Sequence, residues 1–296
     1  MPELPELEVV KEVLQRRVAG QTIERVQLIG GGSAIIVRSL TQQRLEETVA
    51  DAQIAAIERR GKFLIFSLHC ALPLDGLIPR PGEDMAILAE RSVFLALNPK
   101  LTGRLQLAQP AEKRLPKTHL IFSLSSGDQL RYVDQRTMGQ LYLAADLSQV
   151  PEYATLGPEP FDVSLEEFRE RLKPYRGEIK GVLTRGEFIA GIGNAYADEI
   201  LWAARVHPYR KRTALTSEEI ERLYVAMQSV LREAVEKVRV EMGEAIHREP
   251  RDFMAVHLKS GEPCPRCGTP ISLVGANQRI TNFCRTCQPG GLIKGM

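Results

Sequence analysis

The sequence has no apolar run close to the twenty or so residues that a membrane-spanning helix needs. It also lacks a basic segment followed by an apolar one at its start, so we expect no secretory signal and a cytosolic protein. Acidic and basic residues nearly cancel, at a formal net charge of +2. A nucleic-acid surface would therefore have to come from where the charges lie rather than from their total.

Cysteine is scarce, because the 296 residues contain only five. In a cytosolic protein these should not form disulfides. Cys70 lies in an apolar stretch, where a core position is the simplest interpretation, and the other four follow the spacing Cys264-x2-Cys267-x16-Cys284-x2-Cys287. Each CxxC turn can direct two thiolates at one tetrahedral centre, and the intervening segment is long enough for a β-hairpin. The spacing predicts one structural Zn²⁺ ion, whereas separate redox pairs fit it less well.

The first half of the chain begins with a predicted helix over 4–18, because its apolar residues recur on one helical face. Short apolar runs broken by glycine follow, and they are spaced like the strands of a sandwich or barrel. These runs are 22–29, 34–40, 62–70, 92–98, 103–109, 118–124, 130–134 and 139–144. Proline, glycine and acids mark 72–85 as a surface loop between two of the runs.

The pattern becomes helical near residue 150. Ser164 with Glu167, and Thr216 with Glu219, have the spacing of a capping box at a helix start. The last forty or so residues are loop-like and hold the four clustered cysteines. We therefore expect a β-rich domain at 1–150, a helical domain at 151–250 and a zinc module at 251–296.

A glycine turn precedes one of the predicted helices, in "AGIGNAYADEIL". Glycines at a helix start expose backbone N–H groups, which together with the helix dipole can bind a phosphate oxygen. Asn194, directly after Gly193, could cap this helix or donate to the phosphate. The residues alone leave both interpretations open.

The opening "MPELPELEVV" allows two interpretations. Proline early in a helix and acids in the first turn are ordinary features of a helix start. Alternatively, removal of Met1 would leave the secondary amine of Pro2 as the terminus. A terminal amine has a pKa near 8, compared with about 10.4 for lysine, so it is a usable nucleophile at neutral pH. Glu3 and Glu6 would then lie close enough to serve as acid or base.

Four stretches together resemble one protein family. They are "MPELPELEVV", "GKF" at Lys62, "GIGNAYADEIL" and "GEPCPRCGTPI…QRITNFCRTCQ". The chain is similar in this order to the formamidopyrimidine-DNA glycosylase and endonuclease VIII family. The resemblance implies a multidomain α+β fold: an N-terminal β-sandwich with a leading α-helix, a helix–two-turn–helix domain and a C-terminal four-cysteine zinc-finger hairpin. It also implies a monomer of the bacterial cytosol or nucleoid that excises oxidised bases from damaged double-stranded DNA.

The resemblance assigns the chemistry to the amino terminus. By this comparison Pro2 attacks C1′ of the damaged nucleotide, Glu3 assists sugar-ring opening and later proton transfers, and Glu6 supports the site. Glu199 matches a carboxylate that steadies the site. Loss of the base would leave a Schiff base on Pro2, followed by β- and δ-elimination.

The resemblance also assigns the DNA contacts. Lys62, Asn194 and Arg279 match residues that grip the phosphates around the lesion, and His119 matches a histidine that touches phosphate. From the residues alone, a solvated Arg279 and a core or surface His119 are equally ordinary interpretations. The damaged base must leave the stack, which costs a few kcal/mol, so phosphate contacts on both flanks suit this task.

Two turns depart from the family pattern and bear on the substrate. "NPKLTG" replaces "HLGMSG", so that Asn98 stands for histidine and Leu101 for the methionine that fills the gap left by the flipped base. "DQRTMG" replaces "DPRRFG", so that Arg136 can still pair with the orphaned base and Met138 is the apolar wedge. These changes leave 8-oxoguanine, ring-opened purines and oxidised pyrimidines as candidate lesions.

Two other functions are compatible with the same sequence. The changes at Leu101, Thr137 and Met138 would suit an enzyme that acts mainly as an AP lyase with weak base recognition. The zinc module would also suit a non-catalytic zinc-finger DNA-binding protein. Retention of Pro2 and Lys62 argues against the latter, because binding alone would not need a free terminal proline.

Overall fold

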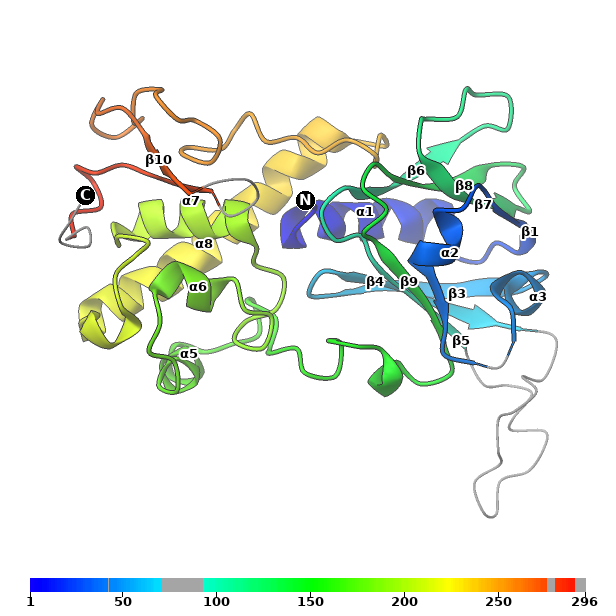
Figure 1. Ribbon diagram of the computed structural model, residues 1–296, viewed down its shortest axis with the longest axis horizontal. Coiled ribbons are helices and arrows are strands. Elements are labelled where there is room, and N and C mark those ends of the chain that lie inside the picture. The colour runs from blue at the N-terminus through cyan, green and yellow to red at the C-terminus, as the bar shows by residue number, and fades with distance from the viewer. Residues whose placement is uncertain (42, 71–92, 276–279, 291–296) are drawn as a thin grey trace, which may run out of the picture. The chain divides into compact units, whose positions relative to one another are not determined.

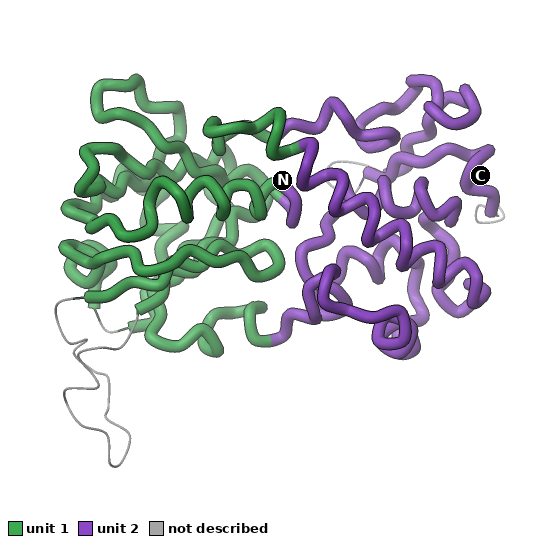
Figure 2. Tube along the Cα trace, turned by 180° about the vertical axis from the view of Figure 1, so that it is seen from behind, with its two compact units in different colours: residues 1–2, 6–154, 238–249 green, residues 3–5, 155–237, 250–296 purple. Residues whose placement is uncertain are grey.

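The computed structural model describes residues 1–41, 43–70, 93–275 and 280–290. The predicted loop at 72–85 and Arg279 therefore lie outside the described residues. Contacts between residues divide the chain into two compact units (Figure 2). Unit 1 comprises Met1–Pro2, Glu6–Ala154 and Val238–Glu249, and unit 2 comprises Glu3–Pro5, Thr155–Lys237 and Pro250–Met296.

Unit 1 contains two β-sheets and a leading helix (Figure 1). The four-stranded sheet has the order β1-β7-β8-β6, and the five-stranded sheet has the order β2-β9-β5-β4-β3. All neighbouring strands are antiparallel except β2 and β9. The elements are α1 (Leu4–Arg17), β1 (Ile23–Leu28), α2 (Ser33–Ile36), β2 (Val37–Ser39), α3 (Leu45–Val49), β3 (Gln53–Arg60), β4 (Phe63–His69), β5 (Val93–Asn98), β6 (Gly103–Ala108), β7 (Thr118–Leu124), β8 (Gln129–Asp134), β9 (Gln140–Ala144) and the 3-10 helix η1 (Leu147–Gln149).

The two sheets share one apolar core. Leu105 and Phe122 from the four-stranded sheet line a cavity of about 20 Å³ together with Phe66 and Leu95 from the five-stranded sheet. Residues of both sheets therefore face each other, which is the arrangement of a β-sandwich. The apolar face of α1 is buried throughout, from Leu7 to Leu14, which confirms the predicted leading helix.

Two segments of unit 1 differ from the sequence-based expectation. The predicted strand at 34–40 begins as the helical turn α2, which buries Ile36 and leaves Ile35 exposed, and only Val37–Ser39 pair as β2. The strand β3 was not predicted at all. Its pairing register with β4 shifts between Ile54 and Ala56. Such a bulge interrupts the alternation of apolar and polar residues by which a strand is recognised in a sequence.

Unit 2 is mostly helical and ends in a small hairpin. Its elements are α5 (Leu165–Leu172), α6 (Ile179–Leu183), α7 (Asn194–Ala204), the 3-10 helix η2 (Arg212–Ala214), α8 (Ser217–Met242), β10 (Ser272–Val274) and β11 (Thr281–Phe283). Both predicted capping boxes are confirmed, because Ser164 and Glu167, and likewise Thr216 and Glu219, exchange side-chain-to-backbone hydrogen bonds.

The core of unit 2 surrounds α7, whose residues Ala197, Ile200 and Leu201 are buried. The edge-to-face rings of Phe168 and Phe188 extend this core toward α5. The described residues contain no helix that is both long and apolar enough to cross a bilayer.

Candidate functional site

The carboxylate of Glu3 is held at the amino-terminal end of α7. It accepts backbone N–H bonds from Gly193 at 2.6 Å, Ala195 at 2.9 Å and Tyr196 at 3.3 Å, and the residue is only 1% exposed. These are the donors that a helix start offers to an anion. The sequence left a phosphate site and capping by Asn194 both open at this glycine turn, and the anion bound there is Glu3. Asn194 does not cap α7, because the cap residue is Gly193.

The same turn also fixes the residue after Glu3. The N–H of Leu4 donates to the carbonyl of Gly191 at 3.1 Å. Gly191 has a φ of +88°, and a Cβ there would lie 2.9 Å from the Cβ of Leu4. Both the backbone conformation and the close approach therefore require glycine at this position.

Pro2 and Glu6 are both buried, and in unit 1 they line one small cavity. Lys62 is half-buried in the turn between β3 and β4. The carbonyl of Gly61 in that turn accepts a hydrogen bond from Arg59 at 3.0 Å. The chain thus directs Pro2 into the unit 1 core while the adjacent Glu3 side chain bonds to α7 in unit 2.

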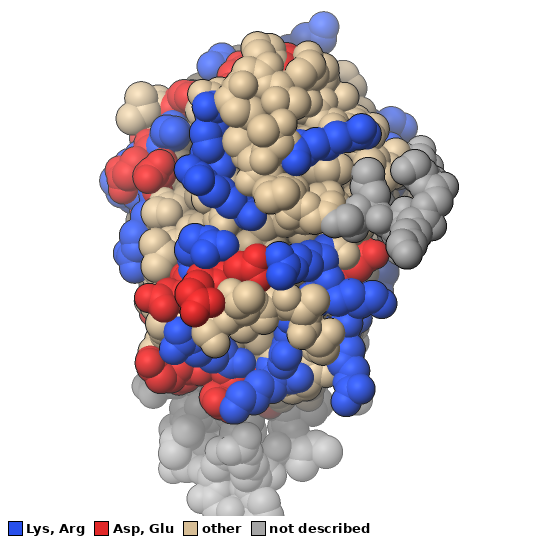
Figure 3. Space-filling view, turned by 90° about the vertical axis from the view of Figure 1, so that its left-hand side faces the viewer, with Lys and Arg blue, Asp and Glu red and all other residues tan. Residues whose placement is uncertain are grey.

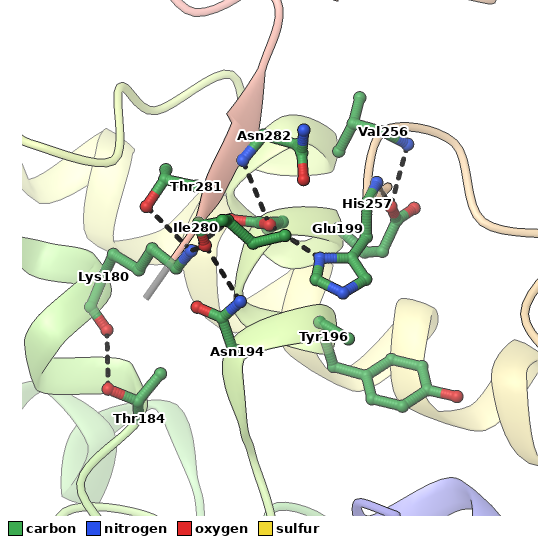
Figure 4. Close-up of polar contacts among 12 residues, drawn as sticks. Lys180, Thr184, Asn194, Tyr196, Glu199, Val256, His257, Ile280, Thr281 and Asn282 are labelled. Carbon is green, nitrogen blue, oxygen red and sulfur yellow. Dashed lines mark hydrogen bonds and ion pairs between the residues drawn. The ribbon is translucent and has the colours of Figure 1, made fainter. Parts of the chain in front are cut away.

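Asn194 and Lys180 meet at one carbonyl oxygen in unit 2 (Figure 4). The side-chain amide of Asn194 donates to the carbonyl of Ile280 at 2.9 Å, and the Nζ of Lys180 donates to the same oxygen at 2.9 Å. Lys180 also donates to the hydroxyl of Thr281. The two side chains therefore hold the start of β11 against α6 and α7.

Two adjacent acids of α7 bind backbone of the cysteine module: Glu199 binds the segment that precedes it, and Asp198 binds strand β11 within its hairpin (Figure 4). Asp198 forms an ion pair with Lys180 at 2.6 Å and accepts hydrogen bonds from the Nδ1–H of His257 at 2.9 Å and the N–H of Asn282 at 3.2 Å. Glu199 accepts N–H bonds at 2.8–2.9 Å from residues 255–257.

Burial perturbs two of these charged groups. It raises the pKa of Glu199, although the three backbone hydrogen bonds oppose the shift. It lowers the pKa of Lys180, although the neighbouring Asp198 carboxylate opposes that shift. The three backbone hydrogen bonds make Glu199 an acceptor for the segment that precedes the cysteine hairpin.

Asp134 in unit 1 organises the turn that carries Arg136 and Met138. Its carboxylate accepts the N–H groups of Arg136 at 3.1 Å, Met138 at 2.9 Å and Gly139 at 2.7 Å. The hydroxyl of Thr102 donates to the same carboxylate and accepts the N–H of Arg136 at 3.1 Å. Thr102 follows Leu101 directly. One carboxylate therefore holds together the two turns that carry Leu101 and Met138, the side chains predicted to fill the gap left by the flipped base (the void-filling turns).

The side chains on these turns differ in exposure. Met138 is 46% exposed, Arg136 is exposed and Leu101 is half-buried. His119 is buried, and its Nε2–H donates to the carbonyl of Asp134 at 2.9 Å. A phosphate contact by His119 stays a prediction.

The four clustered cysteines converge. Their sulfur atoms all lie within 4.8 Å of one another, with 3.9 Å between Cys264 and Cys287 and 3.5 Å between Cys267 and Cys284. Four thiol ligands at one centre are the donor set of a closed structural zinc site. The site can therefore hold one Zn²⁺ ion and leaves it no open position. Cys70, just after β4, is half-buried and not part of the cluster.

Three neighbouring residues contact the cysteine cluster or its surroundings: Thr269, Trp202 and Arg266. The side chain and backbone of Thr269 lower the pKa of Cys267 to about 6, which favours the thiolate that a metal requires. The indole Nε1–H of Trp202 donates to the sulfur of Cys264 at 3.4 Å. The guanidinium of Arg266 lies 4.1 Å from the centre of the Trp202 ring.

Charged side chains of both signs share the surface. Figure 3 shows a face on which Lys and Arg lie among Asp, Glu and uncharged residues. Specific contacts with a charged partner on this face would therefore depend on the placement of single residues.

The structure brings the predicted site residues together in two groups: Glu3, Asn194 and Glu199 around α7, and Leu101, Arg136 and Met138 around Asp134. Sequence reasoning missed the residues that hold them. These are Thr102, Asp134, Lys180 and Asp198. The motifs contain Asp134 and Asp198, but their bonding partners could not be read from local spacing.

Three family models match the chain. They are the formamidopyrimidine-DNA glycosylase N-terminal domain over residues 1–141, the formamidopyrimidine-DNA glycosylase H2TH domain over 156–244 and the zinc finger found in FPG and IleRS over 261–290.

Curated relatives match nearly end to end. The formamidopyrimidine-DNA glycosylase of Symbiobacterium thermophilum is 36% identical over 98% of this chain and 90% of its own length. That of Pelotomaculum thermopropionicum is 33% identical over 97% of this chain and 99% of its own.

Solved structures are similar as well. MutM in complex with DNA containing carbocyclic 8-oxo-G superposes with a TM-score of 0.79 at 29% identity, covering 98% of this chain and 100% of that one. The Lactococcus lactis glycosylase bound to DNA with an AP site superposes with a TM-score of 0.77 at 29% identity, covering 97% and 100%.

Proposed function

Because the chain belongs to the formamidopyrimidine-DNA glycosylase family, we propose that it excises oxidised bases from double-stranded DNA and then cleaves the strand at the abasic site. It would act as a monomer in the compartment that holds the chromosome. The domains that carry this function would be 1–150 for catalysis, 151–250 for DNA binding and 251–296 for the zinc finger.

In the proposed mechanism Met1 is removed and the amine of Pro2 becomes the nucleophile. Its nitrogen forms a bond to C1′ as the bond between C1′ and the base breaks, and the base leaves with a proton. Opening of the sugar ring requires a proton on the ring oxygen, which the carboxyl of Glu3 can supply. The resulting iminium acidifies C2′, so that β- and then δ-elimination release the two strand ends.

The observation that carries this proposal is the attachment of Glu3 to α7. Three backbone N–H groups orient its carboxylate, and it is joined to Pro2 by a single peptide bond. An acid that acts on the sugar must be preorganised beside the nucleophile, and this attachment supports that role. Glu6, which lines the cavity of Pro2, would support the amine.

The proposed DNA contacts rest on the family resemblance and, for Leu101, Arg136 and Met138, on the turns that Asp134 holds. Lys62, Asn194, His119 and Arg279 would bind phosphates, and Arg136 would contact the base opposite the lesion. Leu101 and Met138 would fill the space of the flipped base. Both turns are bonded to Asp134, which supports their insertion into the DNA helix as one unit. The Zn²⁺ ion would hold the hairpin that carries Arg279 and take no part in the chemistry.

A second candidate is an AP lyase with weak base recognition. The observation that favours it is Met138, an exposed side chain without an aromatic ring at the proposed wedge. Excision assays with 8-oxoguanine, formamidopyrimidine, thymine glycol, dihydrouracil and hydantoins distinguish the two candidates. Rapid cleavage of an abasic site with no excision from any lesion would favour the lyase alone.

Borohydride trapping on an oligonucleotide duplex with an abasic site tests the nucleophile. We expect a covalent adduct, located by mass spectrometry on the peptide that begins with Pro2. Pro2→Gly should strongly slow its formation, whereas Pro5→Gly in the same stretch serves as the matched control. No adduct would contradict the proposed mechanism and favour a non-catalytic zinc-finger DNA-binding protein. An adduct unaffected by Pro2→Gly would show that another amine is the nucleophile.

A further inference from the structure

The amino terminus has a fixed carboxylate partner in unit 1. The terminal nitrogen of Met1 lies 2.6 Å from Oε1 of Glu249, whose side chain is 10% exposed. The other carboxylate oxygen of Glu249 lies 3.0 Å from Nη2 of Arg104 on β6. Arg104 also donates from Nη1 to the carbonyl of His247 at 3.3 Å. The carboxylate is thus held in position by a second residue rather than by the terminus alone.

Pro2 and Glu249 line the same cavity of about 20 Å³. This volume is large enough for one water molecule. Removal of Met1 moves the terminal amine by one residue, and adjacent Cα atoms are about 3.8 Å apart. The amine of Pro2 would therefore remain within direct or one-water reach of the Glu249 carboxylate.

We propose that Glu249 is the ionic partner of the Pro2 amine in the processed protein and sets the pH at which that amine becomes nucleophilic. This inference rests on the proposed role of Pro2. The charged groups around the cavity are Glu6 on α1, Arg104 on β6, and Arg248 and Glu249 in the segment that follows α8.

The electrostatics of these groups define the effect. A carboxylate near an amine favours its protonated form, so Glu249 keeps the resting amine as an ammonium. The ammonium must release its proton to solvent before its nitrogen can attack. Arg104 offsets part of the negative charge of Glu249, and therefore limits this effect. Glu3 is adjacent in sequence, but its carboxylate is bound by the N–H groups of α7.

Single-turnover trapping over a range of pH tests the proposal. The processed, full-length, zinc-loaded protein would be mixed with an abasic-site duplex and cyanoborohydride, and the rate of adduct formation measured. In Glu249→Gln the midpoint of the pH profile should fall by about one unit, because the negative charge is lost. Below both midpoints, the variant should form adduct up to about tenfold faster than the wild type.

Two further variants separate this role from a structural one. Arg104→Gln should move the midpoint upward, because it leaves the Glu249 charge unopposed. Glu244→Gln removes a carboxylate of the same segment that pairs instead with Arg16 and Arg17, and it should leave the midpoint unchanged. Opposite shifts in Glu249→Gln and Arg104→Gln cannot arise from general loss of stability.

The trapping experiment distinguishes failure of this inference from failure of the proposed function. Adduct in the wild type with an unchanged midpoint in Glu249→Gln overturns this inference and leaves the proposed function intact. If Glu249→Gln does not fold, an unchanged or lower midpoint in Arg104→Gln overturns it equally. No adduct in the wild type at any pH rejects the proposed function, and this inference with it.

Discussion

The backbone N–H of Gly193 donates a hydrogen bond to the carboxylate of Glu3, with 2.6 Å between nitrogen and Oε2. The two residues are 190 positions apart in the chain. This contact makes Glu3 both a proposed acid and an attachment point for the amino terminus.

Glu3→Gln should stop base removal while DNA binding survives. It should also lower the free energy of unfolding by about 1–3 kcal/mol, because an amide NH₂ would replace one acceptor that faces backbone N–H groups. Lesion excision, DNA binding and denaturant unfolding measure the three effects. Glu24→Gln, on the exposed face of β1, is the control and should change none of them. Equal loss of excision and binding would instead make Glu3 purely structural.

Gly191→Ala should destabilise the protein by about 1–3 kcal/mol, because its φ of +88° is strained for alanine and the new Cβ meets Leu4. Gly181→Ala is the matched control, since a Cβ there meets nothing within 4 Å and α6 favours alanine. Thermal unfolding compares the two variants. Equal stability of both would mean that the turn adjusts freely and does not fix Leu4.

Lys180→Met should lower the free energy of unfolding by about 3–5 kcal/mol, because it leaves the buried Asp198 without its cation. The double variant Lys180→Met/Asp198→Asn should recover part of that loss, since no unpaired charge remains. Lys173→Met, at an exposed position on the same unit, should be nearly neutral. Chemical denaturation provides the comparison, and a double variant no better than the single one would contradict this account.

Thr102→Val should weaken binding to lesion DNA and lower stability by about 1 kcal/mol, because Asp134 loses a hydroxyl donor and the two void-filling turns lose their link. Thr102→Ser retains the hydroxyl and should behave like the wild type. Titration of a duplex with an abasic site measures binding. Full affinity in Thr102→Val would show that the two turns act independently.

Removal of Zn²⁺ by a strong chelator should change the intrinsic fluorescence of Trp202, the single tryptophan, because its indole contacts the ligand Cys264. Re-addition of Zn²⁺ should restore the signal, and Cys267→Ser should abolish the response. DNA binding should weaken in parallel if the hairpin carries Arg279. An unchanged fluorescence spectrum would contradict the placement of Trp202 beside the metal, and unchanged binding would contradict the role of the hairpin.

Local patterns determined a large part of this protein. The cysteine spacing predicted the metal centre, the serine and threonine caps predicted the starts of α5 and α8, and the apolar period predicted the buried face of α1. Each of these signals acts over a few residues, because a helical turn, a cap or a CxxC turn is closed by near neighbours.

Tertiary structure alone decided which polar groups form hydrogen bonds and ion pairs with one another. Glu3 occupies the helix start at which the sequence left phosphate binding and capping both open. The register shift in β3 concealed a strand, and Asp134 joins two turns that are far apart in the sequence. Glu249 reaches the amino terminus across 248 positions. A buried carboxylate needs hydrogen-bond donors, but the sequence around it does not show which donors the fold will place beside it.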